Sequence, residues 1–149
     1  VRTMKIYLDS CTIQRPLDVF TVLRNRLEAE AVLGILGYCD AGALTLVSSD
    51  ALEYEMDQNL LAVRKDHAQA VLAKAKIFIT VELAVEQRTA TFVKRGIKPM
   101  DAIHVALAEA AGVDFFCSCD DRLVRKLKRM KTVQIKSLSP LELIEELES

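Results

Sequence analysis

Four acidic residues stand at positions that a chain of alternating strands and helices would bring together. Asp9 ends one apolar run and Asp120 follows another, while Glu55 and Asp101 lie in the first two turns of expected helices. Carboxylates gathered in one place repel each other and take up protons unless a cation neutralises them. Such hard oxygen ligands suit magnesium or manganese. We therefore predict one Mg²⁺ or Mn²⁺ site formed by Asp9, Glu55, Asp101 and Asp120.

The elements that must position these acids are short apolar runs alternating with longer helical patterns. The expected strands are Lys5 to Asp9, Leu44 to Ser48, Ile77 to Thr80, Phe115 to Ser118 and Val133 to Ile135. The expected helices are Arg24 to Cys39, Asp50 to Val63, Asp66 to Lys76, Glu82 to Lys94, Pro99 to Ala111, Arg122 to Arg129 and a last one from Pro140. Nearly continuous apolar runs are typical of strands covered on both faces. The alternation predicts an α/β fold, with a mainly parallel sheet between two layers of helices.

In a parallel α/β sheet, ligands bind beyond the carboxyl ends of the strands. All four acids fall at that edge. The choice of Glu55 over Glu53 rests on helix geometry, in which both border a stripe of Leu52, Met56 and Leu60. Glu53 has an alternative role, because a helix capped by Asp50 would place it where a capping box needs an acid.

The composition fits one compact domain over residues 1–149, with 51% hydrophobic and 28% charged residues. No apolar stretch reaches the roughly 18 residues of a membrane span, and we expect no signal peptide and a cytoplasmic location. The net charge of −1 gives no overall attraction for nucleic acid. A local basic run offers the alternatives of an RNA-backbone contact or a solvated helix face. Its residues are Arg122, Arg125, Lys126, Lys128, Arg129 and Lys131.

The cysteines stand at positions 11, 39, 117 and 119, and the chain has only two histidines, His67 and His104. This set lacks the paired spacing of a zinc site, so we expect four buried, reduced thiols. His104 lies one turn after Asp101, and we expect it to pack or to support a ligand rather than to bind metal.

Four segments together resemble the acidic motifs of the PIN domain family, in the family's order and over nearly the whole chain. They are Lys5 to Cys11, Ser49 to Glu55, Lys98 to Ala106 and Ser118 to Asp121. The resemblance is closest to the bacterial ribonuclease toxins of toxin–antitoxin pairs, the virulence-associated protein C group.

This resemblance implies a three-layer αβα sandwich and a metal-dependent endoribonuclease that hydrolyses RNA phosphodiester bonds. It implies that Ser118 orients Asp120 or contacts the phosphate. It also implies two partners: a small antitoxin that covers the acidic crevice with a helix or strand, and a second copy of the chain. Apolar residues of the early helices, Val32, Leu33, Leu36 and Tyr38, suit either the core or such a dimer.

Two departures from the family pattern leave alternatives open. Cys11 stands where the family more often has a small polar residue, and Asp121 directly follows Asp120 and is the alternative fourth ligand. Asp9 and Asp120, taken singly, also suit helix caps. One competing function is a PIN-fold binding protein without catalysis. Another is a haloacid-dehalogenase-like phosphatase with Asp9 as nucleophile, although that family has a second Asp at the position of Cys11.

Overall fold

A computed structural model describes residues 3–149 of the chain. These residues form a five-stranded sheet in the order β3-β2-β1-β4-β5, in which every neighbouring pair is parallel. The strands are β1 (Met4–Leu8), β2 (Leu44–Ser49), β3 (Ile77–Ile79), β4 (Phe115–Cys117) and β5 (Lys136–Leu138). The chain adds β2 and β3 on one side of β1 and then returns to add β4 and β5 on the other. The strand order therefore reverses between β1 and β4.

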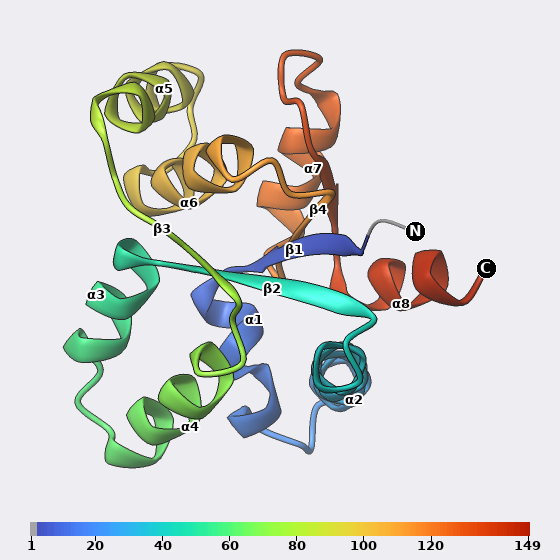
Figure 1. Ribbon diagram of the computed structural model, residues 1–149. Helices are drawn as coiled ribbons and strands as arrows, with labels where there is room; N and C mark the ends of the chain where they lie inside the picture. Colours follow the sequence, from blue (N-terminus) through green and yellow to red (C-terminus); the bar gives the residue numbers. More distant parts are fainter. Residues whose placement is uncertain (1–2) are drawn as a thin grey trace.

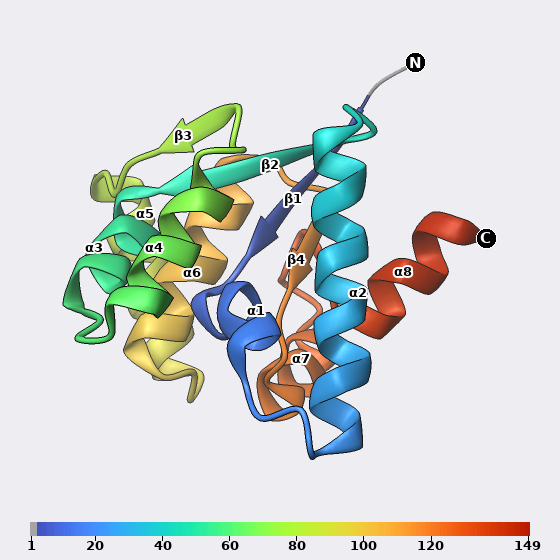
Figure 2. The ribbon, with the colours of Figure 1, turned by 90° about the horizontal axis from the view of Figure 1, so that it is seen from below.

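Helices cover both faces of the sheet, which gives three layers (Figures 1 and 2). The helices are α1 (Ser10–Gln14), η1 (Arg15–Leu17), α2 (Leu23–Asp40), α3 (Asp50–Gln58), α4 (Ala62–Leu72), α5 (Leu83–Lys94), α6 (Pro99–Ala110), α7 (Asp121–Arg129) and α8 (Pro140–Glu148). In Figure 1, α5, α6 and α7 lie above the sheet, and α2, α4 and α8 lie below it. The predicted α/β fold with a parallel sheet between helical layers is confirmed.

The central strands are buried on both faces, as their apolar sequences predict. Ile6, Tyr7 and Leu8 of β1 and Phe116 of β4 have no exposed surface. Because both faces are covered, consecutive side chains, which point to opposite faces of the sheet, all enter the core. Among residues 3–149, no helix is both long enough and apolar enough to cross a bilayer.

The helices predicted from Pro99 to Ala111 and from Pro140 are confirmed, as α6 and α8. Pro99 occupies the first turn of α6, and Gly112 has a φ of 66° just after that helix. Ser139 and Glu142 form a reciprocal capping box at the start of α8. At α3 the predicted cap is wrong: Ser49, not Asp50, caps the helix by accepting from the backbone N–H of Leu52.

Three predicted elements differ from the structure. The helix expected from Asp66 to Lys76 lies four residues earlier, at Ala62–Leu72. The helix expected from Asp50 to Val63 ends at Gln58, and Leu60 is 97% exposed instead of belonging to the core stripe. The side chain of Asn59 accepts from the N–H of Leu61, which stabilises a turn in place of another helical turn. The last strand forms three residues later than predicted, because pairing with β4 sets its register, with Phe115 opposite Lys136. The short helices α1 and η1 were not predicted.

Candidate functional site

The candidate site lies where the strand order reverses, beyond the carboxyl ends of β1 and β4. Leu8 pairs with Cys117 at the ends of these strands, and the backbone N–H of Asp9 donates to the carbonyl oxygen of Cys117 at 3.2 Å. Asp9 therefore leaves β1 beside the segment that carries Ser118 and Asp120. This is the position at which parallel α/β folds bind their ligands.

Asp9 is 4% exposed and caps α1 with one carboxylate oxygen. Its Oδ1 accepts from the backbone N–H of Thr12 at 3.2 Å, the hydroxyl of Thr12 at 2.6 Å and the thiol of Cys11 at 3.2 Å. Asp9 is thus both a cap and a member of the acidic edge. Its Oδ2 has no hydrogen-bond partner within residues 3–149 and remains for a ligand.

Thr12 joins the ends of β1 and β4 and was missed by sequence reasoning. Besides its contact with Asp9, its hydroxyl oxygen lies 3.3 Å from the carbonyl oxygen of Cys117 and accepts from the N–H of Cys119 at 3.0 Å. Its place three residues after a capping Asp was the available signal. Cys11 in the same helix is exposed, so the prediction of four buried thiols is wrong at this position, because α1 turns Cys11 out of the core. The other three cysteines are buried, and all four are free.

Asp101 in the first turn of α6 is half-buried, and its side chain makes no hydrogen bond with the part of the chain that the structure describes. Burial raises the pKa of its carboxyl above the ordinary range, and the negative charges of Asp9 and Asp120 raise it further. The nearby His104 and Lys98 act in the opposite direction. The three aspartates therefore lie close enough to interact as charges.

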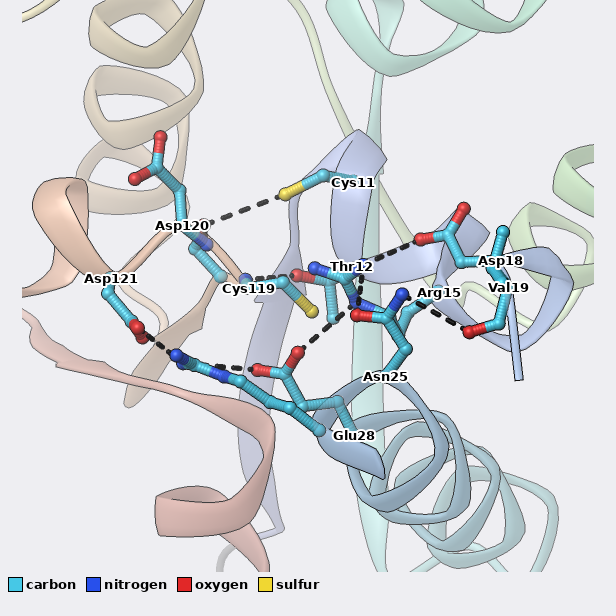
Figure 3. A network of polar contacts seen from close by, with 12 residues as sticks. Cys11, Thr12, Arg15, Asp18, Val19, Asn25, Glu28, Cys119, Asp120 and Asp121 are labelled. Atoms are coloured by element: carbon cyan, nitrogen blue, oxygen red, sulfur yellow. Dashed lines mark hydrogen bonds and ion pairs between the residues drawn. The ribbon is translucent and has the colours of Figure 1, made fainter. Parts of the chain in front are cut away.

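Asp120 caps α7 with Oδ1, which accepts from the backbone N–H groups of Arg122 and Leu123 at 3.1 and 3.2 Å. Together with Asp101 it lines a cavity of about 210 Å³ between α6 and α7. Asp121 has a different orientation, as Figure 3 shows, and its carboxylate forms an ion pair with Arg24. Of the two alternatives for the fourth ligand, only Asp120 shares this cavity with Asp101.

Ser118 is fully buried, and its hydroxyl oxygen accepts from the backbone N–H of Asp120 at 3.0 Å. This bond orients the backbone at the start of α7 and hence the side chain of Asp120. Of the two roles that the family resemblance implied for Ser118, the orienting role matches this contact.

Glu55 contacts Nε2 of His104, which joins α3 to α6 at the same edge of the molecule. Nδ1 of His104 lies 2.6 Å from the hydroxyl oxygen of Tyr7, which lies 2.7 Å from Oγ of Ser49. An ionised carboxylate only accepts, so Nε2 of His104 donates to Glu55, while Nδ1 faces the hydroxyl of Tyr7. Burial raises the pKa of Tyr7 well above its ordinary value, which keeps its hydroxyl protonated for this bond.

This buried chain from Ser49 to Glu55 separates the two glutamate alternatives. Glu53 lies instead in a cavity beside Lys76, Ile77 and Phe78, next to the edge strand β3. The expected supporting role of His104 matches its position, since it is 2% exposed and holds one of the candidate ligands.

The four predicted ligands share one edge but do not form a ready-made ligand cage. Within residues 3–149, no three Asp, Glu, His or Cys side chains are arranged as a metal-binding group. The donor chemistry nevertheless fits a hard divalent cation, because Asp101 is without a hydrogen bond and the caps formed by Asp9 and Asp120 each use only Oδ1. Glu55 remains turned toward His104.

The basic run after Asp121 divides between two surfaces. Arg122 and Lys126 line the cavity that holds Asp101 and Asp120, and Lys98 joins them there from the start of α6. The ammonium group of Lys126 donates to the carbonyl oxygen of Gly96 at 3.1 Å. Lys128 is turned away and pairs with Glu142 of α8. Part of the run therefore lies beside the acids, and part of it stabilises the packing of α7 against α8.

A second polar network lies on the other side of Asp121, around the buried Glu28 of α2 (Figure 3). The carboxylate oxygens of Glu28 lie 3.3 Å from Nε of Arg15 and 3.7 Å from a guanidinium nitrogen of Arg24. Arg24 also pairs with Asp121. This network fastens α2 and η1 to the start of α7 and engages the carboxylate of Asp121.

No protein-family model and no curated protein sequence matches the chain. Among solved structures, it is similar to the crystal structure of PAE2754 from Pyrobaculum aerophilum, with a TM-score of 0.54 and 17% identity. The similarity covers 99% of this chain and 98% of that one. At this level of identity, the two chains share an α/β fold over their whole length, and the likeness carries no information on activity.

Proposed function

We propose that the protein is a PIN-like endoribonuclease that hydrolyses RNA phosphodiester bonds with the help of Mg²⁺ or Mn²⁺. The carrying observation is the set of Asp9, Asp101 and Asp120 at the reversal between β1 and β4, where the pKa of Asp101 is raised by burial and by its two neighbours. Such an arrangement costs folding free energy unless a cation offsets the repulsion. Perturbed acids in a cleft also favour a functional role.

In this proposal, Asp9, Glu55, Asp101 and Asp120 would hold the cation. A divalent cation supplies Lewis acidity toward a phosphate oxygen and makes nearby water more acidic. Thr12 and Ser118 hold Asp9 and Asp120 in place through the hydrogen bonds at the strand ends. His104 orients Glu55 through the contact of its Nε2 with the carboxylate.

The basic side chains beside the acids support a phosphodiester substrate. Lys98, Arg122 and Lys126 line the cavity that contains Asp101 and Asp120. A polyanion can reach an acidic site only where neighbouring cations offset the repulsion. These three residues would contact phosphates on either side of the bond that is cut.

The proposal includes two protein partners, a small antitoxin and a second copy of the chain. Exposed apolar side chains on the segment before α2 and on α2 itself support a covered surface there. They are Val19, Phe20, Val22, Leu23, Leu27 and Leu33. Val32 and Leu36, by contrast, belong to the core. A short neighbouring reading frame for a DNA-binding protein would support the antitoxin, and a strict monomer at high concentration would contradict the dimer.

The test is cleavage of a mixed-sequence RNA with Mg²⁺, with Mn²⁺ and with EDTA. We expect cation-dependent cleavage that is lost in Asp9→Asn and Asp101→Asn, together with weaker Mn²⁺ binding measured by calorimetry. Asp121→Asn and Glu53→Gln are matched controls, since these acids face away from the site. Unchanged cleavage in both Asp9→Asn and Asp101→Asn would overturn the proposed site.

A further inference from the structure

A second cavity, of about 440 Å³, borders the acidic edge on the side of β2 and β3. It lies between α3, α6 and the segment after β3, and its walls are Asp50, Ala51, Tyr54, Val81, Met100 and Ile103. The lining side chains are apolar except for the carboxylate of Asp50 and the hydroxyl of Tyr54. The cavity therefore suits a flat, largely apolar ligand with few polar groups.

Tyr54 gives this cavity an available aromatic face. It is 61% exposed, the highest value among the aromatic residues in 3–149, and Met100 on the facing helix is 41% exposed. The ring of Tyr7 in β1, by contrast, is fully buried. An exposed aromatic ring opposite a methionine is suited to stacking against a planar group.

Asp50 places a carboxylate in the wall of the same cavity. Its Oδ2 accepts from the backbone N–H of Val81 at 3.0 Å. Its Oδ1 is buried and has no hydrogen-bond partner in the part of the chain that the structure describes. The carboxylate is therefore fixed by the backbone of Val81 in a wall that is otherwise apolar apart from the hydroxyl of Tyr54.

On both helices, a residue that lines this cavity stands next in the sequence to a residue of the candidate site. Tyr54 directly precedes Glu55 in α3, and Met100 directly precedes Asp101 in α6. On the other side of Asp101 lies the cavity with Lys98, Arg122 and Lys126. The acids are thus flanked by an apolar cavity and by a basic one.

We infer that the apolar cavity is a nucleobase-binding site, in which Tyr54 stacks on an unpaired base next to the phosphate at the acidic edge. The carboxylate of Asp50 in the cavity wall favours a base that presents an N–H group. A single strand presents bases and phosphates in separate directions, which matches an apolar and a basic surface on the two sides of the acids. The inference rests on the proposed function and makes the substrate single-stranded RNA.

Because the chain contains no tryptophan, Tyr54→Trp introduces a single tryptophan, whose emission can be excited separately from that of the two remaining tyrosines. We expect its fluorescence to be quenched by a mixed-sequence single-stranded RNA in EDTA, where no cleavage occurs, and not by the same sequence as a duplex. Leu33→Trp on α2 is the matched control, since Leu33 is 54% exposed and lies outside the cavity. Its emission should not change.

A second measurement uses the anisotropy of a labelled RNA strand. Tyr54→Ala should bind roughly 5- to 100-fold more weakly, the loss typical of one base–aromatic stack, and Tyr54→Phe should bind like the wild type. Circular dichroism verifies the fold of each variant. Equal binding by Tyr54→Ala and the wild type would overturn the base site.

The outcomes separate this inference from the proposed function. Cleavage by the wild type without quenching in Tyr54→Trp rejects the base site and leaves the nuclease. Quenching without any cation-dependent cleavage keeps the base site and rejects the nuclease. An emission shift that depends on protein concentration and not on RNA means that a second copy of the chain fills the cavity, which overturns the inference.

Discussion

The carboxylate of Glu55 on α3 contacts Nε2 of His104 on α6, and Nδ1 of that histidine lies 2.6 Å from the hydroxyl oxygen of Tyr7 in β1. A candidate ligand at the surface is therefore held by a buried chain that begins in the central strand. Ser49 extends this chain, because it accepts from the N–H of Leu52 while it bonds to Tyr7. The cap of α3 and the orientation of Glu55 thus depend on the same hydrogen bonds.

We predict that His104→Asn reduces Mn²⁺ affinity and RNA cleavage by roughly 10- to 100-fold, the usual effect of removing a group that orients a ligand. His104→Gln should retain more of both, because its amide nitrogen reaches the position of Nε2 and can donate to Glu55. Calorimetric Mn²⁺ titration and cleavage rates measure the two effects. Equal losses in the two variants at unchanged unfolding temperature would argue against an orienting role.

The raised pKa of Asp101 predicts how the free energy of unfolding depends on pH. Its pKa is raised in the folded protein by burial and by Asp9 and Asp120, so the folded state binds this proton more tightly than the unfolded state. The free energy of unfolding therefore falls as pH rises from about 4, near the unfolded pKa, through the raised folded pKa. Above the folded pKa, Asp101 is ionised in both states, and the free energy of unfolding is lowered by the full cost of its charge.

Asp101→Asn removes this penalty. In EDTA at pH 7.5, we expect the variant to melt at a higher temperature than the wild type, because asparagine carries no charge for Asp9 and Asp120 to repel. The difference should shrink at pH 4, and added Mn²⁺ should raise the Tm of the wild type only. Scanning calorimetry measures all three. A variant less stable than the wild type at pH 7.5 would mean that the charge of Asp101 is already compensated within the protein.

The parts of the fold that were predictable from sequence depend on local pattern. The first four strands and the acids beside them follow from apolar runs and from the polar residues that end them. β5 was misplaced because Val133 to Ile135 has a strand-like composition, whereas the ladder with β4 begins only at Lys136. Strand register is a tertiary property, so composition alone does not determine it.

The details of the candidate site depend on contacts between distant residues. Helical spacing placed both Glu53 and Glu55 beside the core stripe, and it is the packing of α3 on α6 that turns Glu55 to His104. The supposed cap by Asp50 was a reasonable local pattern, but Ser49 is one residue earlier and also bonds to Tyr7. Nothing in the sequence indicates the last contact, which spans 42 residues.

Lys126 and Lys128 form a matched pair for testing the basic cavity. Both lie on α7, but Lys126 faces Asp101 and Asp120, whereas Lys128 pairs with Glu142. In binding titrations with single-stranded RNA, Lys126→Ala should lower the slope of log affinity against log salt by about 0.7, the value for one lost phosphate contact. Lys128→Ala should leave the slope unchanged. The same slope change in both variants would mean that only the net charge of the helix matters.

Substitutions of Glu28 test whether the buried ion-pair network around α2 stabilises the fold. Burial raises the pKa of this carboxyl, while the charges of Arg15 and Arg24 act to lower it. Glu28→Ala leaves Arg15 beside an empty space without its buried counter-charge, and we expect a loss of about 3 kcal/mol in the free energy of unfolding. Glu28→Gln keeps the shape and removes a charge that is costly to bury, so it should lose ~1 kcal/mol or less.

Urea unfolding of both Glu28 variants at pH 7 measures the difference. Arg15 retains Asp18, at 2.8 Å, as a partner in each variant, so the comparison isolates the contribution of Glu28. If Ala and Gln both cost less than ~1 kcal/mol, the charge and the shape of the side chain both matter little, and α2 is held by its apolar contacts. If Gln costs as much as 3 kcal/mol, the ion pairs with Arg15 and Arg24 outweigh the desolvation of the carboxylate, and the network is a net source of stability.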